Sequence, residues 1–233
     1  LRPAGGQDRR KTRTETAPMA IRVTLDRILR LSDRFAPASL KQAILATVPA
    51  PARSLATMGG NLCIANEILN LLPWAATVDA RLEIRRQGSV RFVAASKLMN
   101  SLGEPSLEIG EILTRIRIPI GRWNHQVYQR IPRDEATGSP GLGFCALAAI
   151  HKDIIEDIRI SWAFSNSQWY VWSALDAELI GRRLPLSAKE IDNYTAQVSQ
   201  SLLPLAPAND ELLAYRITAM TDWFLRNFPR SAQ

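Results

Sequence analysis

Alternating apolar and charged residues predict a hairpin and a long strand in the first half of the chain. Residues 81–86 alternate between leucine or isoleucine and charged side chains, which is the period of a half-buried strand. Gln87 and Gly88 then form a turn, and residues 90–92 continue the alternation on a second strand. Residues 111–120 carry regularly spaced isoleucines among arginines and predict a third strand. We expect further strands over residues 21–25, 144–150 and 154–164.

Apolar residues at helical spacing mark other segments. They recur at intervals of four over residues 37–48, and Pro49 ends that helix. Ser187 and Glu190 form the capping box of a helix over residues 187–203. We expect further helices over residues 68–78, 94–102, 172–181 and 209–228, and a loop over residues 53–61.

A polar stretch rich in glycine and proline, residues 121–143, divides these elements into two groups. We therefore expect two domains, residues 1–121 and residues 122–233. Each group mixes helices with hairpin-forming strands, so the predicted fold class is α+β.

The composition is that of a globular protein. The chain has 233 residues, of which 46% are hydrophobic and 22% are charged. No apolar run approaches the roughly 18–20 residues of a membrane helix, so we expect no membrane span. Cys63 and Cys145 lie far apart in apolar segments. They predict buried, reduced thiols and a cytoplasmic location, and two thiols alone do not ligate an iron–sulfur cluster.

Positive charge is concentrated at the beginning of the chain. The formal net charge is +7, and residues 1–30 hold eight lysines or arginines against three acids. A basic segment of this kind binds nucleic acid, docks on an acidic protein or faces a phosphate-bearing cofactor. No zinc-finger spacing and no aromatic–basic stripe accompanies it, so we expect no nucleic acid partner.

Two Gly-Gly segments are the candidates for ligand binding, one at residues 3–8 and one at residues 56–61. Glycines let backbone N–H groups approach a ligand, and such nests bind phosphates, although a simple turn is the alternative for each. No Gly-x-Gly-x-x-Gly and no Walker A sequence is present. His125 and His151 have no nucleophile beside them in the sequence and no metal-ligand spacing occurs. We predict no catalytic residue and no metal site, so any redox chemistry comes from a cofactor.

These segments resemble the FAD-binding, or medium, subunit of molybdenum hydroxylases, the xanthine dehydrogenase and carbon monoxide dehydrogenase flavoprotein family. The resemblance rests on their order and spacing over essentially the whole chain. The matching segments are Pro3-Ala-Gly-Gly-Gln-Asp8, Ala56-Thr-Met-Gly-Gly-Asn-Leu62, Leu71–Ala80, Gly110-Glu-Ile-Leu-Thr-Arg-Ile-Arg-Ile-Pro119, Ala177–Leu184 and Leu213-Ala-Tyr-Arg-Ile217. It implies a vanillyl-alcohol-oxidase or PCMH-type FAD-binding domain, here shortened, followed by a small α+β C-terminal domain.

The resemblance implies FAD as the cofactor and assigns its contacts residue by residue. Both Gly-Gly segments would cradle the pyrophosphate, an apolar residue would pack near the flavin or adenine, and a cation would replace a family lysine. These residues are Ala4, Gly5, Gly6, Gln7 and Asp8; Thr57, Met58, Gly59, Gly60 and Asn61; Asn70; Leu113; and Arg130.

The sequence also departs from the family pattern. Asn70 stands where the family usually has an acid. In the family, a strand and a helix precede the first Gly-Gly segment, and we expect both to be lacking here. We also expect that a strand with an Ile-Gly-Ala turn is skipped between Leu31 and Asp33. An alternative therefore stays open, in which a degenerate member keeps the fold without FAD and acts as a structural or assembly subunit. A third hypothesis is that the chain is an unrelated basic binding module.

The resemblance implies that this chain is the flavoprotein subunit of an oxidoreductase complex. Its partners would be a molybdopterin-binding large subunit and a [2Fe-2S] small subunit. Electrons would pass from the clusters through FAD to NAD⁺ or another acceptor.

Overall fold

A computed structural model of the chain describes residues 16–33, 35–64, 71–100, 104–119, 123–133, 136, 141–164, 169–171, 173–205 and 211–229. These residues form two four-stranded antiparallel sheets, with strand orders β1-β4-β2-β3 and β5-β6-β7-β8. The strands are β1 (Thr16–Ala20), β2 (Arg81–Arg86), β3 (Ser89–Ala94), β4 (Ile112–Pro119), β5 (His125–Ile131), β6 (Leu142–His151), β7 (Ile154–Phe164) and β8 (Trp169–Val171).

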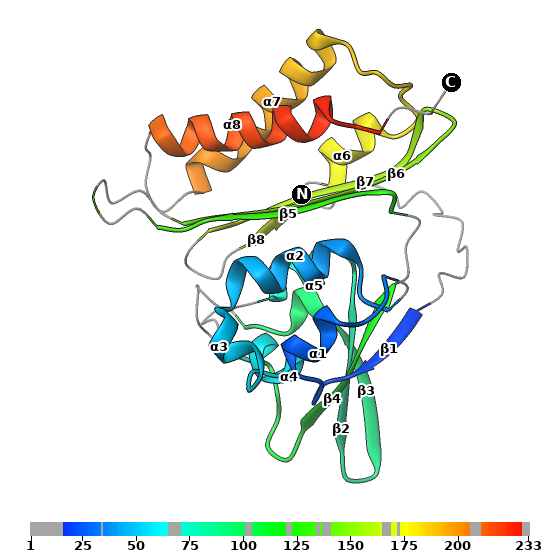
Figure 1. Ribbon diagram of the computed structural model, residues 1–233, viewed down its shortest axis with the longest axis vertical. Coiled ribbons are helices and arrows are strands. Elements are labelled where there is room, and N and C mark those ends of the chain that lie inside the picture. The colour runs from blue at the N-terminus through cyan, green and yellow to red at the C-terminus, as the bar shows by residue number, and fades with distance from the viewer. Residues whose placement is uncertain are drawn as a thin grey trace, which may run out of the picture.

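The first sheet has helices on one face. Its apolar side chains, such as Leu82 on β2 and Ile116 on β4, share one core with apolar residues of the first five helices. In Figure 1 these helices lie to the left of β4, β2 and β3. They are α1 (Leu25–Leu29), α2 (Ala38–Thr47), α3 (Ala50–Arg53), α4 (Met58–Leu62) and α5 (Leu72–Thr77), and a 3₁₀ turn, η1 (Ala95–Lys97), follows β3.

The second sheet is covered on both faces. Alternate residues of β6 point to opposite sides: Phe144 packs with the C-terminal helices, and Cys145 belongs to the core of the first half. Figure 1 shows α2 and α5 below this sheet and α6, α7 and α8 above it. The C-terminal elements are α6 (Ser173–Leu179), α7 (Ala188–Leu202), the 3₁₀ turn η2 (Leu203–Leu205) and α8 (Glu211–Arg226).

Hydrogen bonds tie the two halves together. Trp74 Nε1 donates to Ser39 Oγ over 3.0 Å, and Ser39 Oγ donates to Gln126 Oε1 of β5 over 2.9 Å. Arg159 of β7 also forms an ion pair with Asp79, which follows α5, at 2.6 Å. The proposed division at residue 121 therefore falls between two sheets that share a packed interface.

Most predicted elements are confirmed. The hairpin corresponds to β2 and β3, with Gly88 at φ +78°, and the long strands correspond to β4, β6 and β7. The helix predicted over residues 37–48 is α2, and α7 has the capping box of Ser187 and Glu190. Predicted helices 172–181 and 209–228 correspond to α6 and α8 over their described residues.

Several predictions near the start of the chain are wrong. The strand predicted over residues 21–25 lies earlier, as β1, and Leu25 begins a helix because Thr24 accepts a hydrogen bond from Arg27 N. β1 pairs in antiparallel register with β4. The segment expected to be skipped between Leu31 and Asp33 stays a prediction. Residues 53–61 are not a continuous loop, because α4 begins at Met58.

Further corrections concern element lengths and the polar stretch. Among the described residues of the helix predicted over 94–102, only Ala95–Lys97 is helical. Pro73 lies in the first turn of α5, which begins at Leu72. Residues 121–143 contain β5, and His125 lies on this strand instead of in a linker. Among the described residues, no helix has the length and apolar character needed to cross a bilayer.

Candidate cofactor-binding site

The second Gly-Gly segment folds as the short helix α4. Thr57 is its N-cap, and its Oγ1 accepts a hydrogen bond from Gly60 N over 3.1 Å. Thr57 forms an isolated β-bridge with Thr24, the N-cap of α1, and Leu25 N donates to Ala56 O over 2.9 Å. The two short helices therefore begin side by side, and α4 packs on β4.

The backbone N–H groups of this segment bond within the chain. Those of Met58 and Gly59 donate to Val23 O and Ile21 O, over 3.0 and 2.9 Å. The N–H of Asn61 donates to Thr57 O over 2.9 Å, and that of Gly60 donates to the Thr57 hydroxyl. A pyrophosphate cradle made of these four amides would therefore compete with bonds that the fold already makes.

The two glycines of the segment have different surroundings. Gly59 is buried, and a Cβ placed on it would overlap the side chain of Ile21. Gly60 is exposed, and a Cβ placed there would meet only Thr57 Oγ1, at 3.1 Å. Gly59 is thus required for packing, whereas the open edge of the segment lies at Thr57 and Gly60. This edge is the part of the segment that fits a bound cofactor.

Asn61 has a structural task. Its side chain is buried, and its Oδ1 accepts a hydrogen bond from Leu71 N over 2.8 Å, just before α5 begins. The amide side chain therefore joins α4 to α5. Sequence reasoning missed Ile21, which was expected on a strand and instead closes the Gly59 side of the segment.

The remaining predicted contact residues are spread over both halves. Leu113 lies on β4 opposite Ile84, on the helix-covered side of the first sheet. Arg130 lies on β5 and is half-buried. Residues 4–8 and Asn70 lie outside the described residues. That the residues of both Gly-Gly segments, Asn70, Leu113 and Arg130 contact FAD stays a prediction.

Other buried ionisable groups have structural explanations. Burial raises the pKa of Asp176 to about 7, although Tyr194 Oη donates a hydrogen bond to it over 2.8 Å. Burial lowers the pKa of His125, whose ring stacks on Phe224 with centroids 4.7 Å apart. Cys63 and Cys145 are free thiols, as expected, but only Cys145 is buried, whereas Cys63 is partly exposed. Burial raises the pKa of Cys145 to about 12. Such a thiol is a poor nucleophile.

Comparison with known proteins finds a family match within the first half of the chain. Residues 17–121 match the family described as the FAD binding domain in molybdopterin dehydrogenase. The chain is 25% identical over 177 residues to the xanthine dehydrogenase FAD-binding subunit of Escherichia coli O157:H7. The match covers 72% of this chain and 59% of that protein, so the chain spans about three fifths of the curated relatives it matches.

The fold is similar to those of two solved structures. One is CO dehydrogenase from Oligotropha carboxidovorans, with a TM-score of 0.71 and 18% identity over 91% of this chain and 73% of that chain. The other is quinoline 2-oxidoreductase from Pseudomonas putida 86, with a TM-score of 0.68 and 20% identity over 91% of this chain and 74% of that chain. The comparisons confirm the resemblance and the α+β fold class that the sequence predicted.

Proposed function

We propose that this chain binds FAD and serves as the electron-transfer flavoprotein of a molybdenum hydroxylase, because residues 17–121 match the family described as the FAD binding domain in molybdopterin dehydrogenase. The family match is the observation that carries the proposal. The likeness to a xanthine dehydrogenase FAD-binding subunit supports it.

Within this proposal, the first Gly-Gly segment, residues 4–8, supplies most of the backbone contacts to the pyrophosphate. The second segment contributes its open edge, where the Thr57 hydroxyl is a donor and Gly60 leaves room for close approach. Leu113, Asn70 and Arg130 remain the proposed contacts elsewhere along the cofactor. Met58, Gly59 and Asn61 support the site indirectly. The backbone N–H groups of Met58 and Gly59 bond to the segment between β1 and α1, and the Asn61 side chain accepts a hydrogen bond from Leu71 N at the start of α5.

The chemistry belongs to the cofactor. FAD, when bound, accepts electrons singly and delivers them in pairs. The residues of this chain then bind and orient FAD and neutralise its phosphates, and no acid or base from the chain is required. We place its electron donors on a [2Fe-2S] small subunit, which is fed by a molybdopterin-binding large subunit, with NAD⁺ or another molecule as the acceptor. The two free thiols support a cytoplasmic location.

Two glycine variants test the binding site. Gly60→Val is expected to keep the fold, because Gly60 is exposed and an added Cβ would meet only Thr57 Oγ1. It is expected to weaken FAD binding at least tenfold by filling the open edge. Gly59→Ala is expected to destabilise the fold by about 1–3 kcal/mol, because the added methyl overlaps Ile21. Flavin titration and thermal unfolding of both variants separate the two effects. Unchanged FAD affinity in a folded Gly60→Val protein would remove this edge from the site.

One observation favours a second candidate function. All four N–H groups of residues 58–61 have acceptors within the chain, as expected of a family member that keeps the fold without FAD. Such a chain would act as a structural subunit of the complex. Titration of the wild-type chain with FAD distinguishes the two functions, because only the flavoprotein shows saturable binding.

A further inference from the structure

The outer face of the first sheet carries a cluster that the family assignment does not explain. In the antiparallel register, Arg81, Glu83 and Arg85 of β2 lie on the face opposite the buried Leu82 and Ile84. The neighbouring strands β3 and β4 add five residues to the same face. The cluster, called the arginine face below, consists of Arg81, Arg85, Arg115 and Arg117, the carboxylate of Glu83, and the apolar side chains of Val90, Phe92 and Ile112.

One carboxylate, that of Glu83, lies among the four arginines of this face. Glu83 is buried beneath Arg85, Arg117 and Arg115, whose nitrogens lie 2.8, 3.3 and 3.8 Å from its oxygens. Burial raises the pKa of Glu83, but hydrogen bonds from Arg85, Arg117 and Thr114 outweigh that effect and lower it. Glu83 is therefore ionised at neutral pH and neutralises one of the four arginines.

The remaining positive charge is available to a partner. Arg85, Arg115 and Arg117 keep 40–50% of their side-chain surface exposed. Arg81 is exposed and makes no ion pair with a described residue. The arginine face thus carries about three unbalanced charges on a rigid sheet.

Apolar residues lie among these charges. Val90, Phe92 and Ile112 are 50%, 48% and 66% exposed, and the Arg117 guanidinium stacks over the Phe92 ring at 4.7 Å. Arginine and aromatic residues are enriched at the centres of protein–protein interfaces, where apolar contact and charged hydrogen bonds combine. A nucleic acid backbone would use the arginines but not the exposed aliphatic side chains.

The charge of the face excludes two occupants from this chain. Residues 1–15 carry five lysines or arginines and two acids, so the face would repel that segment. A second copy placed face to face would bring arginines against arginines. The complementary surface is acidic and has an apolar centre.

We propose that the arginine face is a docking surface for an acidic patch on another subunit of the enzyme complex. This inference rests on the proposed function, because the partner is one of the subunits that function requires. Carboxylates of the partner would pair with Arg81, Arg85 and Arg115, around an apolar contact with Phe92. Association through this face would be faster at low ionic strength and would weaken as salt is added.

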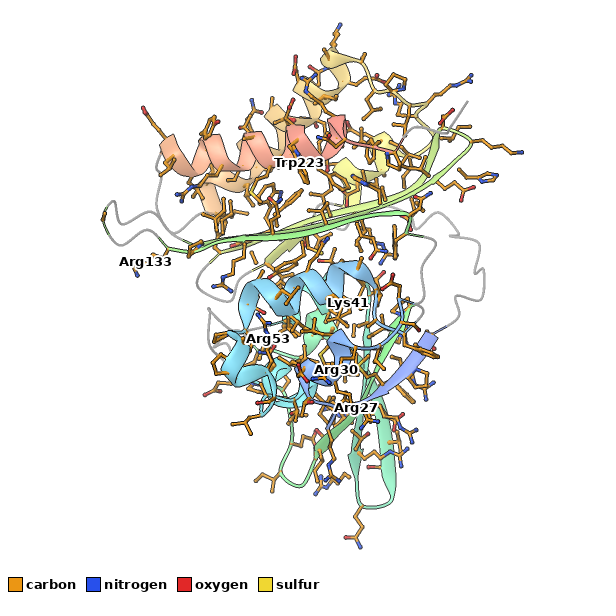
Figure 2. All side chains as sticks on the ribbon, in the orientation of Figure 1. Arg27, Arg30, Lys41, Arg53, Arg133 and Trp223 are labelled. Carbon is orange, nitrogen blue, oxygen red and sulfur yellow. The ribbon has the colours of Figure 1, made fainter. Side chains whose placement is uncertain are left out.

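The test uses the full chain together with its large and small partner subunits. The double variant Arg81→Glu/Arg85→Glu reverses charge on the face and leaves the Arg117–Glu83 contact in place. The matched control, Arg27→Glu/Arg183→Glu, changes two exposed arginines elsewhere, and Figure 2 shows Arg27 on α1, which packs on the opposite side of the sheet. Affinity of the complex is measured at two salt concentrations, with thermal unfolding and FAD content as checks on the fold and the cofactor site.

The expected result is at least tenfold weaker assembly for the face variant, normal assembly for the control, and unchanged FAD content for both. Normal assembly of the face variant would overturn the docking proposal and leave the flavoprotein function intact. A wild-type chain that neither assembles nor binds FAD would overturn both proposals. Saturable binding of duplex DNA that the face variant loses, without any effect on assembly, would replace the protein partner with a nucleic acid.

Discussion

The two sheets of this protein differ in how many of their faces are covered. The β5-β6-β7-β8 sheet lies between α2 and α5 on one face and α6, α7 and α8 on the other (Figure 1), and residues 144–149 of β6 are all buried. The β1-β4-β2-β3 sheet is covered by helices on one face, and its other face exposes charged and apolar side chains.

This difference separates stability from recognition. A sheet buried on both faces derives stability from nearly every side chain, so its strands tolerate few changes. A sheet with an open face can present a fixed pattern of charges, because the side chains on that face are not part of the packed core. The comparison predicts that substitutions on the two sheets affect different measurements.

The largest effect is expected from Phe144→Ala on the covered sheet. The ring of Phe144 is fully buried, with its centroid 4.5 Å from that of Trp162, so truncation leaves a cavity. The free energy of unfolding should fall by about 3–5 kcal/mol. On the open sheet, Phe92→Ala should cost about 1 kcal/mol or less, because half of that ring is exposed. Chemical denaturation of both variants measures the contrast, and equal losses would contradict it.

A smaller loss is expected where the two halves meet. Ser39→Ala removes the acceptor of Trp74 Nε1 and the donor to Gln126 Oε1. Because Trp74 is fully buried, its unpaired N–H should reduce the free energy of unfolding by about 1–3 kcal/mol. Ser54→Ala, at an exposed serine, is the control and should have little effect. Wild-type stability of Ser39→Ala would show that this bond does not hold the halves together.

The covered sheet also predicts a pH dependence through Asp176. Because its pKa is raised to about 7, the folded state holds one more proton than the unfolded state between pH ~4 and pH ~7. This group therefore makes stability fall as pH rises through that window, by up to about 1.4 kcal/mol per pH unit. Asp176→Asn should flatten the slope, and Asp192→Asn, at an exposed aspartate, should not. An unchanged slope in Asp176→Asn would contradict the assignment.

The open sheet predicts the opposite sign through Glu83. Because the pKa of Glu83 is lowered, its ionised form stabilises the fold at pH values above the ordinary carboxyl pKa. This contribution is lost as pH falls through the folded-state pKa of Glu83. Glu83→Gln should therefore lose stability at neutral pH and approach the wild type in acid. Urea denaturation at several pH values measures this effect, which we expect to be the smallest of the four. A Glu83→Gln variant as stable as the wild type at neutral pH would count against the charge cluster.

The sequence predicted best the elements whose pattern is set locally. Alternation predicted the β2–β3 hairpin, and the Ser187–Glu190 capping box located α7. In each case the information lies within one segment, in its period or its cap.

The missed elements depend on contacts that are distant in the sequence. The sequence of β5 is polar, but its polar groups are bonded to α2. Gln126 Oε1 accepts a hydrogen bond from Ser39 Oγ, and Tyr128 N donates to Gln42 Oε1. The role of Gly59 depends on Ile21, 38 positions earlier in the sequence. The resemblance located the second Gly-Gly segment, but only the structure separates the buried Gly59 from the open Gly60.

The most direct test of the central claim is the flavin content of the purified chain. The protein is saturated with FAD, excess cofactor is removed, and the absorption spectrum is recorded before the flavin is released by heat and identified by chromatography. The account predicts flavin absorption bands and close to one FAD per chain, with most of it lost in Gly60→Val. A folded wild-type protein that stays colourless after this treatment would contradict the flavoprotein function.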